Sequence, residues 1–465
     1  MTGRPRRVAV IGAGPAGFFS CEALLKEGFE VDLYDALPTP FGLVRAGVAP
    51  DHPKIKVITH RYEKTATDPG FRFFGGVRLG AELSRAQLLE RYHAVVYAVG
   101  TSSDNRLGIP GEDRPGSHPA TEFVAWYNGH PEHADREFDL ATKCAVVVGN
   151  GNVAIDVARM LVLGRDELRV TDTADHAVDA LVASGVDHVI ILGRRNPAQA
   201  AFTSPELLEL GELPEVDVIV SPQEVALDEQ SARWVEEHGD RNVRRNLEIL
   251  TDYSQRPPQG RPHRIELRFL RSPLEVVGDG DGAPISGLRV RRNRIGWDEK
   301  DGPVAVPTTE EELIECGLVL RSIGYRGRPL GDLPFDESRG VIRNDGGRVV
   351  DEDGCAAQGE YVVGWIKRGP SGVIGTNKKD AADTVARLFE DAESGRLNQP
   401  SIQATGDEVE AWLRGHVPDL VTWDGWRRID AHEVAAGQRH GRPRVKVVTV
   451  AEMTAIARRA DGVEA

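Results

Sequence analysis

The stretch Gly12-Ala13-Gly14-Pro15-Ala16-Gly17 decides the fold of the first part of this chain. It follows an apolar run at residues 7–12, which is typical of a buried parallel strand, and it opens a helical pattern at residues 16–26. A second strand is expected at residues 30–34. Gly-x-Gly-x-x-Gly between a strand and a helix is the fingerprint of a dinucleotide-binding βαβ unit. Gly12 allows the tight turn, Gly14 admits a pyrophosphate and Gly17 lets the helix approach the sheet.

Asp35 stands at the end of this second strand. A carboxylate about 20 residues after the glycines can bind the hydroxyls of a ribose. The start of the helix adds backbone N–H groups and a positive dipole end for the phosphates. We therefore expect a nucleotide in this first unit.

A second fingerprint, Gly149-Asn150-Gly151-Asn152-Val153-Ala154, lies between an expected strand at 143–149 and an expected helix at 152–163. Alanine in the third place is a variant found in sites for phosphate-bearing cofactors. The next strand, at 187–192, ends in Gly193-Arg194-Arg195 without an acidic residue. Two arginines would bind a 2′-phosphate that a carboxylate would repel. The second nucleotide is therefore predicted to be NADP(H), and two dinucleotides in one chain favour hydride transfer.

The rest of the chain predicts how the two units are connected. An extra helix is expected within residues 164–184, and an antiparallel excursion over residues 255–310, with short strands at 264–269 and 288–292. Further strands are expected at 318–324 and 360–364, the latter followed by a glycine-rich turn and a helix from about residue 378. Because residues 360–376 can complete the first unit, the second unit is predicted to be inserted within the first. The tail is expected to hold helices at 406–414 and 450–459 and a strand at 444–449.

Composition limits the classes of function. The chain has 465 residues and a net charge of −15, which disfavours nucleic acid as the main partner. The basic start before an apolar run resembles a signal peptide, but that run is the fingerprint itself. The net charge also favours a cytoplasmic protein, and because no apolar stretch reaches membrane-spanning length, no membrane insertion is expected. No two of the four cysteines form Cys-x-x-Cys, which argues against a zinc ribbon, a cysteine-ligated iron–sulfur cluster and a redox-active disulfide: Cys21, Cys144, Cys316 and Cys355. No metal site is predicted.

Five blocks in order carry a resemblance to a known family. They are the two fingerprints, LPTPFGLVRAGVAPDHPKI at 37–55, LGRR at 192–195 and GWIKRGPSGVIGTNKKDA at 364–381. Over residues 7 to about 388 the chain resembles the adrenodoxin reductase family of ferredoxin–NADP+ reductases, its bacterial members above all. The resemblance implies two Rossmann-like domains, an FAD domain at 1–103 and 326–465 (with a C-terminal extension) and an inserted NADP domain at 104–325. It implies reversible hydride transfer from NADPH to FAD, then single-electron transfer to a separate ferredoxin-type iron–sulfur protein.

The same resemblance assigns residues to the two cofactors. The residues implied for FAD are Gly12, Gly14, Ala16, Gly17, Asp35, Leu43, Val77, Trp365, Gly372, Val373 and Ile374. Those implied for NADP are Asn150, Gly151, Asn152, Val153, Arg194, Arg195, Glu206 and Gly372. A side chain at Gly372 is expected to obstruct the stacking of the two reactive rings. His52 and Glu209 match a family pair near the redox site and are the catalytic candidates, although His52 between Asp51 and Pro53 reads equally as a turn residue.

Several alternatives stay open at this level. A glutamate-synthase-type reductase would normally bring cysteine-rich motifs, and a flavin disulfide reductase would need Cys-x-x-Cys. A flavoprotein that binds NADPH without turnover is the alternative from another class. An acidic ferredoxin would need a basic patch on this chain. The candidates are residues 289–294, or Arg241 with Arg244 and Arg245. The simpler interpretation is that these arginines only face the solvent. A monomer is favoured.

Overall fold

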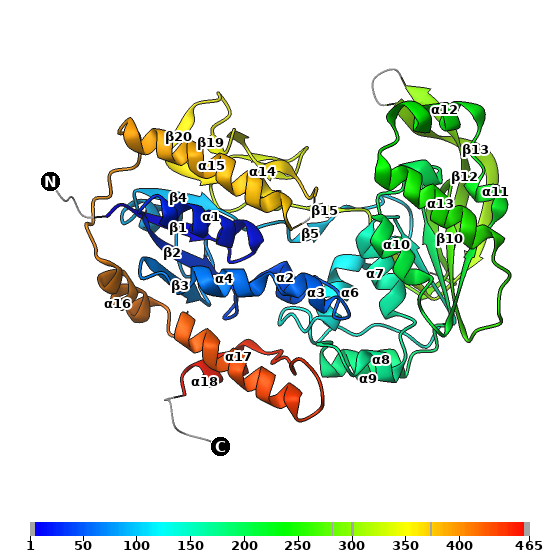
Figure 1. Ribbon diagram of the computed structural model, residues 1–465, viewed down its shortest axis with the longest axis horizontal. Coiled ribbons are helices and arrows are strands. Elements are labelled where there is room, and N and C mark those ends of the chain that lie inside the picture. Colours follow the sequence, from blue (N-terminus) through cyan, green and yellow to red (C-terminus); the bar gives the residue numbers. More distant parts are fainter. Residues whose placement is uncertain (1–4, 281, 299–301, 373, 460–465) are drawn as a thin grey trace.

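The computed structural model describes residues 5–280, 282–298, 302–372 and 374–459, and two α/β domains lie side by side in it (Figure 1). The sheet of the first domain has eight strands in the order β18-β19-β20-β4-β1-β2-β3-β21. They are β1 (Arg7–Ile11), β2 (Glu30–Asp35), β3 (Phe71–Gly75), β4 (Ala94–Tyr97), β18 (Asn344–Asp345), β19 (Arg348–Val350), β20 (Ala356–Val362) and β21 (Val421–Thr422). Strand β20 pairs in parallel with β4, so the late part of the chain completes the sheet that the first fingerprint begins.

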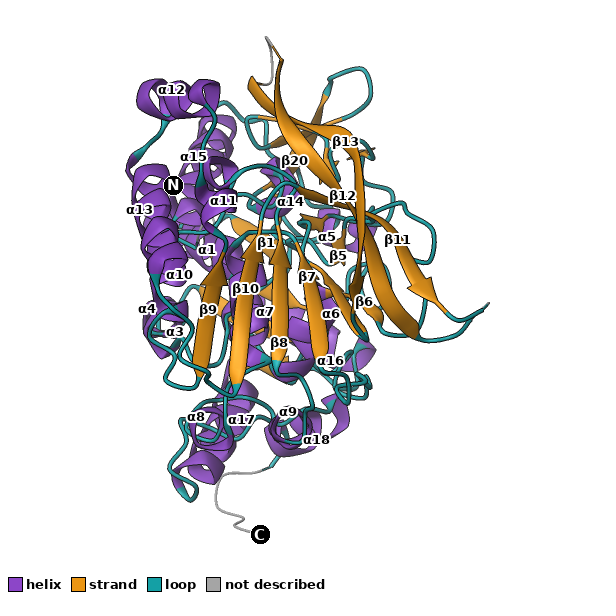
Figure 2. Cartoon of the chain, turned by 90° about the vertical axis from the view of Figure 1, so that its right-hand side faces the viewer, coloured by secondary structure: helices purple, strands orange, loops and turns teal. Residues whose placement is uncertain are grey.

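The second domain has a six-stranded parallel sheet in the order β6-β14-β7-β8-β10-β9, seen face-on in Figure 2. Its strands are β6 (Ser117–Pro119), β7 (Cys144–Val148), β8 (His188–Leu192), β9 (Val216–Val220), β10 (His263–Arg268) and β14 (Leu318–Arg321). All of them fall between the strands of the first sheet in sequence. The fold class predicted above, an α/β protein with one dinucleotide-binding domain inserted in another, is thereby confirmed.

One strand was assigned to the wrong sheet. Residues 264–269 were expected in the antiparallel excursion, whereas β10 lies between β8 and β9 in the parallel sheet. Only Ile265 and Leu267 of β10 are fully buried, and this alternation is typical of a half-exposed antiparallel strand. The antiparallel part is the three-stranded sheet of β11 (Arg271–Gly278), β12 (Ile285–Asp298) and β13 (Gly302–Glu315).

The chain passes between the domains twice, and the two passages pair with each other. Strands β5 (Ser103–Asp104) and β15 (Tyr325–Arg326) form an antiparallel ribbon. The expected boundaries, 103/104 and 325/326, fall in this ribbon. A further small pair is β16 (Phe335–Asp336) with β17 (Val341–Ile342).

Helices α1 (Pro15–Lys26) and α15 (Thr376–Glu393) pack against each other over the first sheet (Figure 1). The extra helical part expected within 164–184 is present as α8 (Arg165–Leu168) and α9 (Asp175–Val182). The other helices are α2 (Leu43–Ala46), α3 (Pro53–Lys56), α4 (Thr59–Thr65), α5 (Arg85–Leu89), α6 (Ala120–Tyr127), α7 (Asn152–Met160), η1 (Pro197–Gln199), α10 (Ser204–Leu210), α11 (Pro222–Val225), α12 (Glu229–His238), α13 (Arg241–Gln255), α14 (Trp365–Arg368), α16 (Gly406–His416), α17 (Trp423–Gln438) and α18 (Val450–Ala457). Among the described residues, no helix combines the length and apolar character needed to cross a membrane.

The C-terminal segment from α17 onward contacts both domains through buried charged groups. Residues 444–449 of this segment do not form the strand that was expected. Glu433 of α17 is fully buried and accepts both arms of the Arg45 guanidinium, at 2.8 and 2.5 Å. The buried Lys446 ammonium donates to Arg45 O (3.2 Å) in the first domain and to Asn128 Oδ1 (3.1 Å) in the second. Side-chain contacts, rather than a sheet, therefore hold this segment across the two domains.

Candidate active site between two glycine loops

The first glycine loop has the geometry of a pyrophosphate site. Gly12 has φ +109°, and a Cβ on it would lie 2.5 Å from Ala98 O. A Cβ on Gly17 would lie 2.0 Å from Gly12 O, so glycine is needed for α1 to approach the sheet. Gly14, which caps α1, has no atom within 4 Å of an added Cβ. The chain itself therefore does not require glycine at position 14, whereas close approach of a ligand to the backbone would.

Asp35 supports the same loop. Its carboxylate accepts hydrogen bonds from Ala13 N (2.8 Å) and Leu37 N (2.9 Å). Burial raises the pKa of Asp35 to about 6, against these two hydrogen bonds, which lower it. The carboxylate thus fixes the backbone of the glycine loop, and its contact with a ribose stays a prediction.

The second loop repeats this geometry. Gly149 has φ +123°, and a Cβ there would lie 2.0 Å from Ser322 O. Gly151 caps α7 and, like Gly14, has no atom within 4 Å of an added Cβ. Ala154 lies in the first turn of α7 and is fully buried. The Asn152 side chain accepts a hydrogen bond from Thr203 N (2.8 Å), so the ligand-facing groups at this helix start are backbone N–H groups.

Arg194 and Arg195 follow β8, where the sequence placed them. Arg194 is exposed and Arg195 half-buried, and among the residues that the structure describes neither guanidinium has an ion-pair partner. Burial and the neighbouring charge of Arg194 lower the pKa of Arg195. Asn293 Nδ2 anchors the turn by donating to Arg194 O at 2.8 Å. Two adjacent cations without a carboxylate are suited to an anionic ligand.

The block at residues 364–381 lies against the first fingerprint. Gly364 has φ +79°, and a Cβ on it would lie 2.7 Å from Ala16 Cβ. Nearby, Trp365 Nε1 is buried and has no hydrogen-bond partner within the described ranges. Gly372 has φ +80°, and its Cβ would lie 2.5 Å from Thr376 Oγ1, so this turn requires glycine for its own conformation.

The remaining residues expected around the flavin lie on the same domain. Val77 is buried and donates its backbone N–H to Asp35 O. Leu43 is unusually exposed for a leucine, at 37%. Ile374 packs on the core of the first domain, and Val373 lies outside the described residues.

His52 and Glu209, 157 residues apart, meet where the two domains touch. His52 Nε2 lies 2.7 Å from Glu209 Oε2, joining the turn before α3 to α10. Helix α7 adds Asp156 and Arg159, and α10 adds Glu206. We call this group the seam cluster: Asp51, His52, Asp156, Arg159, Glu206 and Glu209.

Arg159 organises the seam cluster although it is only 2% exposed. It donates to Asp51 (2.6 and 3.0 Å), to Asp156 (3.0 Å) and to Glu209 (3.0 Å). Burial raises the pKa of Asp156 to about 7 and also raises that of Glu206, whose Oε2 is buried without a hydrogen-bond partner. Sequence reasoning missed Asp51, Asp156 and Arg159. The spacing of Asp156 and Arg159 on one face of the predicted helix was a signal that could have found the last two.

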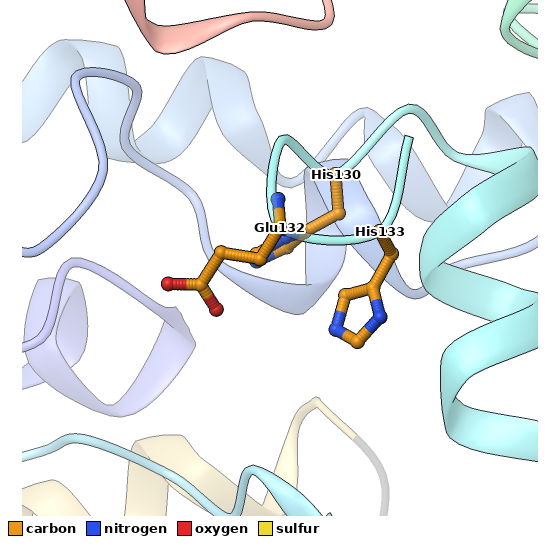
Figure 3. Close-up of side chains that lie close together, drawn as sticks. All are labelled: His130, Glu132 and His133. Atoms are coloured by element: carbon orange, nitrogen blue, oxygen red, sulfur yellow. Dashed lines mark hydrogen bonds between the residues drawn. The ribbon is translucent and has the colours of Figure 1, made fainter. Parts of the chain in front are cut away.

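A second cluster follows α6 and is drawn in Figure 3: His130, Glu132 and His133. His130 Nδ1 accepts the Glu132 backbone N–H at 3.2 Å, so the neutral ring carries its proton on Nε2. Glu132 pairs with Arg78 of the first domain. Burial lowers the pKa of both histidines, that of His130 to about 4. The two histidine rings of this turn between the domains are therefore neutral. On His130, one ring nitrogen carries the proton and the other accepts a hydrogen bond, so neither has a free lone pair for a metal ion.

The basic stretches considered for docking are mostly engaged within the chain. Arg244 donates to the backbone oxygens of Gly239 (3.0 Å) and Glu236 (2.9 Å), and Arg245 pairs with Glu248. On β12, three arginines pair with glutamates of the neighbouring strands: Arg289, Arg291 and Arg292. Neither stretch is a concentrated positive patch.

Comparisons with known proteins agree with this geometry. Residues 6–189 match the family described as pyridine nucleotide-disulphide oxidoreductase. The chain is 46% identical over 458 residues to the NADPH-ferredoxin reductase FprA of Mycobacterium leprae, covering 97% of this chain and 98% of that protein. It is 39% identical to the mitochondrial NADPH:adrenodoxin oxidoreductase of Salvelinus fontinalis, covering 97% and 91%. The solved structure of Mycobacterium tuberculosis FprA in complex with NADPH superposes with a TM-score of 0.91 at 46% identity, covering 98% and 100%.

Proposed function

This chain belongs to the adrenodoxin reductase family of ferredoxin–NADP+ reductases, and from that membership we propose how its own residues serve the reaction. It is an FAD- and NADPH-dependent oxidoreductase that passes electrons to a ferredoxin-type iron–sulfur protein. When bound, FAD can accept the two electrons of a hydride together and release them one at a time.

FAD fits the first glycine loop. Gly14 leaves its helix start open to a pyrophosphate, and Gly364 keeps the later segment close to Ala16. The buried Trp365 Nε1 is a donor with no hydrogen-bond partner in the part of the chain that the structure describes. The exposed Leu43 lies two residues after Phe41, whose N–H bonds to this loop at Ala13 O, and is an apolar surface suited to a cofactor. Asp35 would hold the adenosine ribose while fixing the backbone of the loop.

NADPH fits the second loop. The open helix start at Gly151 receives the pyrophosphate, and Arg194 and Arg195 hold the 2′-phosphate. Glu206 Oε2, which is buried and accepts no hydrogen bond from the described residues, is an acceptor suited to an amide group such as that of nicotinamide. These roles select NADPH over NADH because NADH has no group for the two arginines.

The seam cluster is where residues of both domains meet, so His52 and Glu209 would orient groups at the reacting rings.

We place the domain boundaries in the β5–β15 ribbon. We also place the protein in the cytoplasm, as a monomer. Because most of the arginines of α13 and β12 are engaged within the chain, docking of an acidic ferredoxin would rest on shape and on few free charges.

The two open helix starts carry this assignment most directly, together with Arg194 and Arg195, which have no ion-pair partner among the described residues. Its test is a steady-state assay with NADPH, a ferredoxin and a haem protein that reports reduced ferredoxin. Rapid reduction that needs both NADPH and ferredoxin supports the function. Equal rates with NADH, or no dependence on ferredoxin, would contradict it.

A further inference from the structure

The C-terminal segment includes a loop, residues 439–449, whose two ends are held by the first domain. Helix α17 precedes the loop and buries Trp426 and Ile429 in the apolar core of that domain. Helix α18 follows the loop and buries Met453 in the same core. The loop is therefore part of the first domain, and any contact that it makes with the second domain joins the two.

Arg442 of this loop reaches the second domain. Its guanidinium donates to the backbone oxygens of Thr171 (3.1 Å) and Thr173, and it pairs with Asp175 at the start of α9. The side chain is only 9% exposed, although it lies in a loop. Among the described residues, every partner of this guanidinium belongs to the second domain. Arg442 is thus one attachment between the domains, and its five N–H donors allow it to bind several acceptors at once.

Lys446 makes a second attachment, through the Asp172 carboxylate of the second domain. Besides its contact with Asn128, the buried Lys446 ammonium lies 3.4 Å from Asp172 Oδ2. Lys56 of α3, in the first domain, binds the same carboxylate at 2.6 and 2.8 Å. Two ammonium groups of the first domain therefore share one carboxylate of the second. Separating such a buried ion pair is costly because it leaves charges without compensation, so this contact resists movement of the domains.

These attachments lie on the other side of the domain contact from the covalent connection. Figure 1 shows the β5–β15 ribbon above that contact, and it shows α17 with the loop that follows it below. A two-stranded ribbon alone would allow the domains to rotate about it as a hinge. An attachment on the opposite side opposes that rotation. We call residues 442–446 the strap.

We propose that Arg442 and Lys446 are positioning residues for hydride transfer, because the strap holds the domains at the angle at which the two cofactor sites face each other. Neither residue is among those assigned to FAD or NADPH, so both act only through this angle. Hydride transfer needs the reacting atoms within about 3–3.5 Å, and a misplacement of about 1 Å can lower the rate about 100-fold. The inference rests on the proposed function, since the angle matters to the reaction only if nucleotides on the two domains react with each other.

The angle is tested first, by the distance between spin labels on the two domains of the FAD-loaded enzyme. Of the four cysteines, all of which the structure describes, Cys355 in the first domain is the exposed one. Arg233→Cys adds a labelling site on α12 of the second domain, where Arg233 pairs with Glu229 of the same helix. Burial raises the pKa of the Cys144 thiol to about 11, so this half-buried cysteine reacts slowly with a label at pH 7.

The enzyme with the unmodified strap should give one narrow distribution of distances. Arg442→Gln and Lys446→Met should each broaden the distribution or shift its maximum, because the domains gain freedom to rotate. Arg442→Lys keeps a charged donor and should stay closer to the unmodified enzyme. Arg458→Gln is the matched control, because Arg458 also lies in the C-terminal segment but binds Asp419 of the first domain. It should leave the distribution unchanged.

The reaction is tested by rapid anaerobic mixing of the same variants with NADPH. In Arg442→Gln the limiting rate of flavin reduction should fall about tenfold or more, because the reacting atoms lose their alignment. The FAD content and the NADPH concentration that gives half the limiting rate should change about twofold at most, since both cofactor sites are intact. A role in folding alone would leave the limiting rate unchanged at temperatures well below the melting temperature.

The proposal is overturned if Arg442→Gln and Lys446→Met both leave the distances unchanged, or if the distances change and the limiting rate does not. Should Lys446→Met fail to fold, Arg442→Gln decides alone, because its partners are two backbone oxygens and a carboxylate that is 61% exposed. If NADPH reduces the flavin and the strap variants behave like Arg458→Gln, only the role of the strap is wrong. If NADPH does not reduce the flavin of the unmodified enzyme, the proposed function itself is wrong, whatever the distances show.

Discussion

Gly364 and Ala16 lie so close that a Cβ on Gly364 would be 2.7 Å from Ala16 Cβ, although 348 residues separate them. Ala16 belongs to the first fingerprint and Gly364 to the segment after β20, which pairs with β4. The contact brings the two ends of the discontinuous domain together at the loop assigned to FAD. Gly364 also has φ +79°, a conformation in which side chains are strained.

Gly364→Ala should weaken FAD binding about tenfold or more, since strain and overpacking together cost about 2–4 kcal/mol. The ratio of flavin absorbance to protein absorbance after dialysis measures how much FAD the variant retains. Gly369→Ala is the matched control: φ is +87° there, but no atom lies within 4 Å of the added Cβ. Equal FAD retention in the two variants would show that the Ala16 contact is not what matters.

Gly14→Ala and Gly151→Ala separate folding from ligand binding, because neither added Cβ meets an atom within 4 Å. Both variants should fold, with melting temperatures near that of the unmodified enzyme. Gly14→Ala should lose FAD, and Gly151→Ala should keep FAD while its KM for NADPH rises about tenfold or more. Normal FAD content in Gly14→Ala would argue against the first loop as the pyrophosphate site.

Arg194→Gln and Arg195→Gln should each raise the KM for NADPH by about 10- to 100-fold, because each removes a hydrogen bond to a charged phosphate worth about 1.5–3 kcal/mol. The maximal rate at saturating NADPH and the KM for NADH should change little. Arg245→Gln, whose guanidinium pairs with Glu248, is the control. An equal loss for NADH and NADPH would point to a structural role for the two arginines.

The lowered pKa of Asp172 predicts that the stability of the folded chain depends on pH. Burial opposes its ionisation, but the charges of Lys446 and Lys56 lower its pKa to about 2 in the folded chain. Because the unfolded chain binds this proton first, near pH 4, the contribution of about 2 kcal/mol is complete above pH 5 and is lost as the pH falls towards 2. Asp172→Asn should therefore lower the urea midpoint at pH 7 and have only about a third of that effect at pH 2.5. An equal loss at both pH values would contradict this account.

The sequence predicted the parts of the fold that depend on local pattern. The strands and helices around Gly12 and Gly149 lie within a few residues of their expected bounds, because glycine spacing and apolar runs are local signals. Strand β10 was misplaced because its alternation is also that of an antiparallel strand. Helix α17 was missed, and the extended segment 444–449 was taken for a strand, because buried contacts such as Lys446 with Asn128 are made far along the chain.

The residues of the candidate site also differ in whether the sequence predicted them. Arg194 and Arg195 follow from their place after β8, and the pairing of His52 with Glu209 was available through the resemblance. Arg159 was missed because an arginine in a helix usually lies in solvent, whereas this one is buried and donates to Asp51 of the other domain.

The most direct test of this account is anaerobic mixing of the purified, FAD-containing protein with NADPH, followed by oxidised ferredoxin. The flavin absorbance should be lost rapidly with NADPH and far more slowly with NADH, and it should return as two equivalents of ferredoxin are reduced. Flavin absorbance that NADPH leaves unchanged would contradict the central claim, that two nucleotides held by the loops at Gly12 and Gly149 exchange a hydride in this chain.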